Sequence, residues 1–199
     1  MPAPRPLPNL IVPIDDPTHP LPRLDLFPMT PPFLQASLEG NLAEAMRHLP
    51  ASLPDGWPGE HSWLLKIRLP QLEKKPELQP WLVRAMVDRS LGAMVGFIGF
   101  HGPPGDESLK EFSPNAAEFG FTVLPPYRRQ GYAQEASLAL MQWATREHGV
   151  TEFVLTISPD NFASQALAAK LGFVRIGSHM DESDGPEDVL ERRVAASLS

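Results

Sequence analysis

The segment from residue 118 to residue 157 constrains the fold more than any other part of the chain. Residues 118–124 form an apolar, strand-like run that Pro125 and Pro126 end. After a basic turn, Gly131 opens a helical pattern that reaches His148, and residues 152–157 return to a strand of Phe, Val, Leu and Ile. Two strands joined by a long helix pair in parallel, with a right-handed crossover. We therefore predict an α/β fold that contains one βαβ unit.

The remaining pattern adds strands and helices on both sides of this unit. Apolar runs predict strands, and capped or periodic segments predict helices. The predicted strands cover 23–27, 81–88, 93–101, 173–179 and 189–195, and the predicted helices cover 31–39, 41–48, 60–73 and 161–171. The whole order predicts a mixed α/β sheet flanked by helices.

The domain organisation follows from length and proline content. Eleven of the 24 prolines lie in the first 32 residues. Proline fixes φ and removes a backbone donor, so we expect residues 1–22 to form an extended tail or surface strap. Residues 23–199 are a suitable length for a single domain.

Composition opposes several classes of function. The formal charge of −7 and the pI near 5.3 oppose a nucleic-acid-binding surface, which needs clustered Lys and Arg. No run approaches the ~20 apolar residues of a membrane span, and the N-terminus lacks a secretory signal pattern. With no cysteine, the expected location is the cytoplasm. The six histidines include no pair at i,i+4, so we expect no protein metal site.

The turn between residues 127 and 133 carries the clearest chemistry. A helix N-terminus offers unpaired N–H groups and partial positive charge, and Gly131 has no Cβ to block a diphosphate. Arg128 and Arg129 add positive charge, and small Ala133 permits close packing. No GxxxxGK[ST] motif occurs, and the glycines between Gly96 and Gly102 have the wrong spacing for a dinucleotide site.

Two blocks resemble the GNAT superfamily of N-acetyltransferases. Arg128, Gly131 and Ala133 match the family's pyrophosphate loop, in which Gln or Arg precedes Gly by three residues and Gly or Ala follows two later. Asn161 to Ser164, followed by Lys-Leu-Gly-Phe at 170–173, resembles a second family block. The resemblance covers roughly 80–180 and is nearest to the ribosomal-protein-alanine N-acetyltransferases.

This resemblance implies a GNAT-like fold, a central, mostly antiparallel twisted sheet that is splayed at the cofactor site and flanked by helices. It implies acetyl-CoA as co-substrate, direct attack by an amine and no metal. Acetyl-CoA would lie along strand 118–124, with backbone N–H groups near Val123 or Leu124 stabilising the oxyanion. The implied cofactor-binding residues are Val123, Leu124, Arg128, Arg129, Gln130, Gly131, Tyr132, Ala133 and Asn161.

Two residues are candidates for proton transfer. Glu118 is either the base that takes the amine's proton through water or a solvated strand residue. Position 168 holds alanine where the family commonly has a tyrosine acid, so Ser164 is the substitute candidate. Ser164 could instead serve helix packing or a local hydrogen bond. Asn161 could cap the helix, bind the pantetheine amide, or do both.

Several alternatives stay open at this point. The chain could be an acyl-CoA-binding sensor without catalysis, motivated by Ala168, or a transferase of a longer acyl group. The acceptor is an unidentified amine, and the protein is a monomer or a homodimer. Five acids within 181–188 form either a solvated turn or a wall that attracts a cationic acceptor. Trp57 is either the opposite wall or, as we favour, a buried cover.

Overall fold

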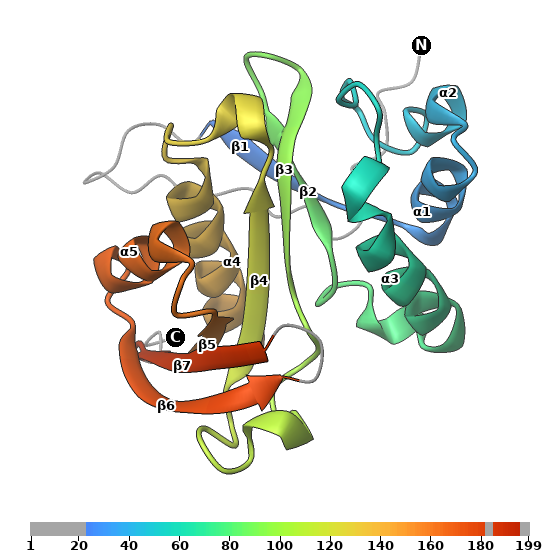
Figure 1. The fold of residues 1–199 in the computed structure, drawn as a ribbon. Coiled ribbons are helices and arrows are strands. Elements are labelled where there is room, and N and C mark those ends of the chain that lie inside the picture. The colour runs from blue at the N-terminus through green and yellow to red at the C-terminus, as the bar shows by residue number, and fades with distance from the viewer. Residues whose placement is uncertain (1–22, 182–184, 196–199) are drawn as a thin grey trace. The chain divides into compact units, whose positions relative to one another are not determined.

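A computed structural model describes residues 23–181 and 185–195 of the protein (Figure 1). The strands follow the hydrogen-bonded order β1-β2-β3-β4-β5-β7-β6 in one seven-stranded sheet. Among the pairs whose direction is given, only β4 and β5 run parallel, and the sheet is open. The strands are β1 (Leu24–Pro28), β2 (Arg84–Asp88), β3 (Ala93–Phe100), β4 (Ala117–Val123), β5 (Glu152–Ile157), β6 (Val174–Asp181) and β7 (Gly185–Arg193).

Five α-helices lie within the described residues. They are α1 (Pro31–Leu38), α2 (Leu42–Ala45), α3 (Ser62–Lys74), α4 (Tyr132–His148) and α5 (Phe162–Lys170). In that part of the chain no helix has both the length and the apolar composition needed to cross a bilayer. The predicted mixed α/β fold, with a mostly antiparallel sheet flanked by helices, is confirmed.

The chain divides into two compact units, which we describe separately. The first unit contains residues 1–98 and 122–139, and the second contains 99–121 and 140–199. Residues 1–22, the predicted proline-rich tail, lie outside the described residues. The single domain expected over 23–199 therefore stays a prediction.

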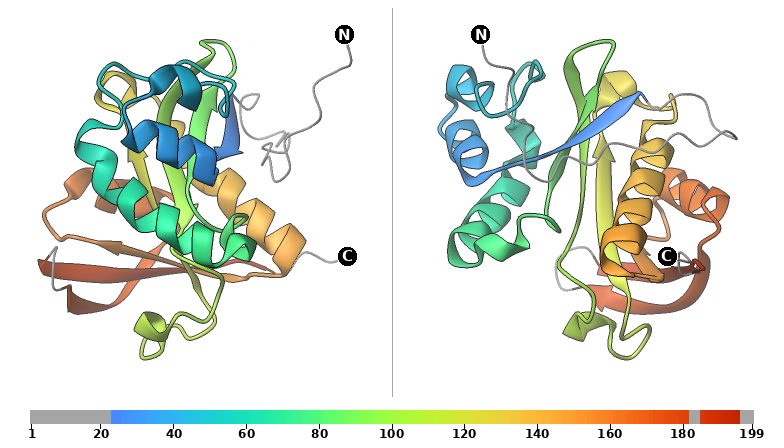
Figure 2. Two further views of the ribbon diagram at one scale, coloured as in Figure 1. Left: turned by 90° about the vertical axis from the view of Figure 1, so that its right-hand side faces the viewer. Right: turned by 180° about the vertical axis from the view of Figure 1, so that it is seen from behind.

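In the first unit, helices α1, α2 and α3 lie on one side of β1, β2 and β3 (Figure 2). Apolar side chains from these elements form one core, which includes Phe33, Leu65, Leu72, Val87 and Phe97. Trp57 is 4% exposed in this core, and its indole N–H donates to the Ser37 hydroxyl at 3.0 Å. Trp57 is thus a buried cover, as the sequence analysis favoured.

In the second unit, aromatic rings hold strands β3, β4 and β5 together. Phe100 packs against Phe119, Trp143 and Phe153 with ring centroids 5.9 to 6.3 Å apart, and Phe119 packs against Phe173 at 6.1 Å. These distances are typical of favourable aromatic pairs. The apolar residues of the predicted strands therefore form the core of this unit.

Strands β4 and β5 separate shortly after they begin to pair. The register couples Ala117 to Phe153 and Glu118 to Val154, and it extends no further along the described residues of the two strands. The first three residues of β4 are buried, whereas Gly120 to Val123 are partly exposed. The backbone of β4 is therefore left without a β5 partner beyond Glu118, as expected for a splayed sheet.

Several predicted boundaries were wrong, and the helix predicted over 41–48 ends at Ala45. Trp81 and Leu82 precede β2, because both of their amides donate to the Leu78 carbonyl in a helical turn. The last strand begins at Gly185, because residues 185–188 pair with β6 despite their acidic side chains. The acidic run thus ends one strand and starts the next.

Candidate functional site

The predicted pyrophosphate loop ends at the start of helix α4, in the first unit. Arg129 and Gly131 have φ values of 60° and 87°, in the left-handed region that favours glycine. The Glu135 amide donates to the Gly131 carbonyl at 3.1 Å, so the amides of residues 131–134 have no acceptor inside the helix. Arg128, Arg129, Gln130 and Gly131 are exposed, Ala133 is half-buried and Tyr132 is buried. The loop therefore presents basic side chains to solvent next to amides that have no acceptor in the helix.

Arg23, which the sequence analysis did not select, lies against this loop. Its Nε donates to Glu135 Oε2 at 3.1 Å, and its Nη2 donates to the Gln130 carbonyl at 2.9 Å. Its guanidinium carbon stands 4.4 Å from the centre of the Tyr132 ring. A Cβ on Gly131 would meet Arg23 Nη2 at 3.5 Å, so the guanidinium lies directly beside the glycine.

Glu135 and Tyr132 fix the loop from the helix side. Glu135 Oε1 also accepts the backbone N–H groups of Arg23 and Leu24, at 2.6 and 2.8 Å. The Tyr132 hydroxyl donates to Asp88 Oδ2 at 2.8 Å, and Asp88 Oδ1 accepts bonds from Ser90 and Leu91 in the turn after β2. One carboxylate thus joins the β2–β3 turn to the first residue of α4.

The Asp88 contact changes the acidity of both partners. Burial raises the pKa of Asp88, but hydrogen bonds from Ser90, Tyr132 and Leu91 outweigh it and leave the pKa below its ordinary value. Burial and the Asp88 carboxylate together raise the pKa of Tyr132. The pair is therefore a neutral phenol that donates to an ionised carboxylate.

The end of β4 distinguishes the two predicted backbone donors. The Leu124 amide donates to the Val95 carbonyl at 3.0 Å, so its N–H is already used in the sheet. Neighbouring residues of a strand direct their N–H groups to opposite edges, so the Val123 amide lies on the other edge. The Val123 carbonyl accepts Arg128 Nε at 3.0 Å, which folds Arg128 back on the strand. Val123 is the better candidate for an oxyanion donor.

Glu118 belongs to a polar cluster in the second unit. It is 9% exposed, its Oε1 accepts the Thr156 hydroxyl at 2.5 Å, and its Oε2 lies 3.3 Å from His101 Nδ1. Burial raises the pKa of Glu118, but the hydrogen bond and charge of His101 and the bond from Thr156 outweigh it, and the pKa lies below its ordinary value. Glu118 is therefore an ionised, positioned carboxylate and not a solvated strand residue.

The start of helix α5 holds the second pair of predicted residues, also in the second unit. The Asn161 side chain accepts the Ser164 amide at 3.2 Å, which caps the helix. This bond uses the amide oxygen, so the NH₂ group of Asn161 is still available as a donor. Ser164 is half-buried, and Ala168 is completely buried one turn later.

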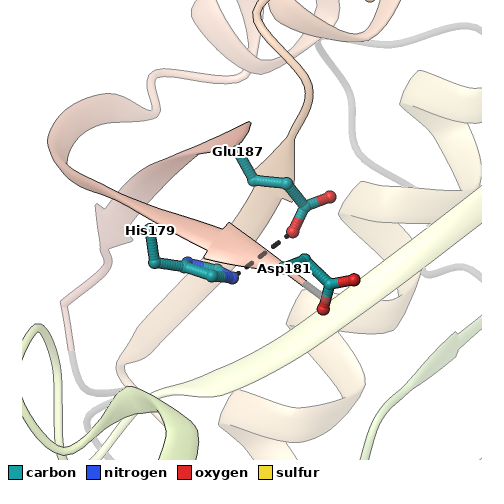
Figure 3. A group of neighbouring side chains, drawn as sticks. All are labelled: His179, Asp181 and Glu187. Carbon is teal, nitrogen blue, oxygen red and sulfur yellow. Dashed lines mark ion pairs between the residues drawn. The ribbon is translucent and has the colours of Figure 1, made fainter. Parts of the chain in front are cut away.

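The acidic run forms part of the β6–β7 hairpin. Asp188 accepts bonds from Arg175 and Gln165 at 2.5 and 3.3 Å, so its charge is used inside the hairpin. Glu187 Oε2 lies 3.5 Å from His179 Nε2, and Asp181 joins them on the same face (Figure 3). Glu182 and Asp184 lie outside the described residues. A sequence search for histidine pairs could not find this group, because cross-strand pairing brings it together.

The residues that sequence reasoning missed are Arg23, Asp88, His101, Thr156 and Glu135. Arg23, Asp88, His101 and Thr156 each contact a predicted site residue or its loop from elsewhere in the chain, and Glu135 binds Arg23. Arg23 and Glu135 are 112 residues apart, and Tyr132 and Asp88 are 44 apart. Each missed residue is a charged, imidazole or hydroxyl residue with no motif around it, and Glu135 lies in the first turn of helix α4.

Comparisons with known proteins bear on the family. Residues 23–174 match the family described as Acetyltransferase (GNAT) domain. A curated relative, the FsC-acetyl coenzyme A-N(2)-transacetylase of Aspergillus fumigatus, is 28% identical over 131 residues, which is 66% of this chain. The match spans only about half, 52%, of the fungal protein.

Solved structures share the fold. A protein from Bordetella pertussis assigned to the GnaT family of acetyltransferases aligns with a TM-score of 0.61 and 22% identity, covering 87% of this chain and 98% of its own. A ribosomal L7/L12 alpha-N-protein acetyltransferase in complex with coenzyme A aligns with a TM-score of 0.58 and 18% identity, covering 88% and 96%. At these identities the likeness concerns the fold.

Proposed function

We propose that the chain, which belongs to the GNAT family of acetyltransferase domains, is an acyltransferase that transfers the acetyl group of acetyl-CoA to a primary amine. The proposal rests on the groups that lie at the start of helix α4. There, free amides at residues 131–134 and the Arg23 guanidinium lie at a glycine whose φ is 87°. A diphosphate is the ligand that such an arrangement suits.

We assign the pyrophosphate to the amides of residues 131–134, with Arg23 and Arg129 as charged partners. Arginine carries five N–H donors, and two of those on Arg23 are used by Glu135 and Gln130. Within residues 23–181 and 185–195, three donors are therefore available to phosphate oxygens. Because Glu135, Gln130 and Tyr132 already orient the guanidinium, little conformational entropy is lost when a phosphate binds. The NH₂ group of Asn161 is proposed to donate to the pantetheine arm.

The chemistry is proposed as direct transfer. The acceptor nitrogen attacks the thioester carbonyl carbon, the resulting oxyanion receives the Val123 N–H, and the C–S bond then breaks. Glu118 takes the proton that the nitrogen loses, directly or through one water, and His101 and Thr156 hold its carboxylate in place. Ser164 or water returns a proton to the leaving thiolate. No step requires a metal ion.

A second candidate function has one observation in its favour. Ala168 is completely buried at the position where the resembling family commonly has a tyrosine acid. A protein that binds acyl-CoA as a sensor would not need that acid. A transferase of a longer acyl group is the other alternative, and the acceptor amine is unassigned in every case.

The test measures release of free thiol from acetyl-CoA across a panel of amines, including peptides with free N-termini and polyamines. Direct transfer predicts release that depends on the amine and on the enzyme, with an acetylated product detected by mass spectrometry. Stoichiometric binding of acetyl-CoA without release would favour the sensor. Faster release from longer acyl-CoA donors would favour a transferase of a longer acyl group.

A further inference from the structure

His179, Asp181 and Glu187 converge on one face of the β6–β7 hairpin (Figure 3). His179 and Glu187 are directly opposite each other in the register of the two strands. Asp181 follows His179 by two residues, and side chains two apart in a strand point to the same face. Each residue offers one ligand atom, and the three atoms lie within 4.8 Å of one another. The group is formed by backbone pairing and not by a flexible loop.

The distances approach those of a coordinated transition metal. Zinc binds nitrogen and oxygen at ~2.0–2.2 Å, so two ligands of a tetrahedral ion stand ~3.4 Å apart. His179 Nε2 and Glu187 Oε2 are 3.5 Å apart. The three ligand atoms lie within 4.8 Å of one another, which is wider than the spacing around a bound ion. Rotation of a carboxylate side chain can close this difference.

We propose that these three side chains bind one divalent transition-metal ion, with water completing the coordination. One imidazole and two carboxylates favour zinc, cobalt or nickel over magnesium and calcium, which prefer oxygen ligands alone. The site is separate from the residues assigned to acetyl transfer. It does not depend on the proposed function.

The ring of Phe112 lies beside the His179 imidazole of the site. The Phe112 and His179 rings lie 6.4 Å apart, and a Cβ on Gly177 would clash with Phe112 at 2.4 Å. Glycine at 177 thus leaves room for the Phe112 ring beside this strand. Asp188 is bound by Arg175 and Gln165, so it is not a ligand in our assignment.

A bound ion would connect β6 to β7. It would also bring positive charge to the Asp181 and Glu187 carboxylates of the hairpin. Binding to the folded state alone stabilises that state by mass action, so the melting temperature should rise with metal concentration.

The experiment uses the full chain without an affinity tag, treated with a chelator and then titrated with Co²⁺ followed by competing Zn²⁺. Visible absorption of Co²⁺ reports the coordination, and calorimetry gives stoichiometry and affinity. We expect one equivalent to bind. Removing an outer partner of a metal ligand already costs ~10–100-fold in affinity, so His179→Ala and Glu187→Gln should each cost at least that much.

The matched control is His48→Ala. His48 Nε2 lies 3.0 Å from Glu44 Oε1, which gives a similar pair without the third ligand of the hairpin group. Metal affinity and the Zn²⁺-dependent rise in melting temperature should be unchanged in this variant and lost in His179→Ala. Melting without metal checks that both variants fold. Absence of stoichiometric binding, or equal affinity in wild type, His179→Ala and Glu187→Gln, would overturn the proposal.

Discussion

Replacing Arg23 with methionine is expected to weaken coenzyme A binding by about 5- to 30-fold while the protein stays folded. A hydrogen bond to a charged group contributes ~1.5–3 kcal/mol. The Arg23 side chain is 42% exposed, so solvent screening reduces the expected loss to ~1–2 kcal/mol. Each 1.4 kcal/mol corresponds to about tenfold in affinity, which gives the stated range.

The assay is calorimetric titration at fixed ionic strength with two ligands, coenzyme A and pantetheine. Pantetheine has no phosphate, so its affinity should not change in Arg23→Met. Arg23→Lys keeps the charge but loses the planar guanidinium. Its affinity for coenzyme A should lie between those of the wild type and the methionine variant. Arg47→Met is the matched control, because Arg47 is 77% exposed and, among the residues that the structure describes, pairs with Glu44 of its own segment.

Two results would refute the reasoning. If Arg23→Met binds coenzyme A as tightly as the wild type does, the guanidinium is not a phosphate ligand. If the affinities of the variant for coenzyme A and for pantetheine fall by the same factor, Arg23 serves only to shape the loop. If the wild type itself binds no coenzyme A, the proposed function fails and not merely this assignment.

Three further predictions concern the same two units. Glu118→Gln should lower turnover by ~10²-fold or more with little change in coenzyme A affinity. The loss should shrink at high pH, where the amine deprotonates unaided. If the pH–rate profiles of the variant and the wild type match, Glu118 is not the base. Gly131→Val should abolish tight coenzyme A binding, because φ of 87° is strained for a β-branched residue; unchanged affinity in a folded variant would place the site elsewhere. Tyr132→Phe should lose ~1–3 kcal/mol in urea unfolding at neutral pH, because Asp88 loses a charged hydrogen bond. Since the pKa of Asp88 is lowered in the folded state, this difference is complete above the ordinary carboxyl range and should shrink as pH falls through the lowered value; a pH-independent difference would contradict the assignment.

The local sequence pattern predicted the strand and helix around the loop. It did not predict the contacts that hold the loop in place. The strand at 152–157 and helix α4 were predicted to within one residue, because glycine, proline and apolar spacing act over a few neighbours. The Arg23 contacts depend on which strand lies beside α4. That arrangement is decided by packing between distant segments, and one sequence does not reveal it.

The acidic hairpin shows a second kind of limit. Charge density favours a turn over 181–188, but the pairing of β6 with β7 places Asp181 and residues 185–188 in strands. Register then decides which acids face one another, and a shift of one residue would reverse every side chain. The juxtaposition of His179 with Glu187 is therefore a property of the register.

The contacts of Arg23 also fix where the chain can be shortened or fused. A form that begins at Arg23 would keep the guanidinium, and its α-ammonium would replace the backbone N–H group that donates to Glu135. A form that begins one residue later would place a new α-ammonium near Glu135, which supplies charge but no planar fork. If the proposed function holds, we expect the boundary between residues 23 and 24 to decide whether a shortened protein binds coenzyme A.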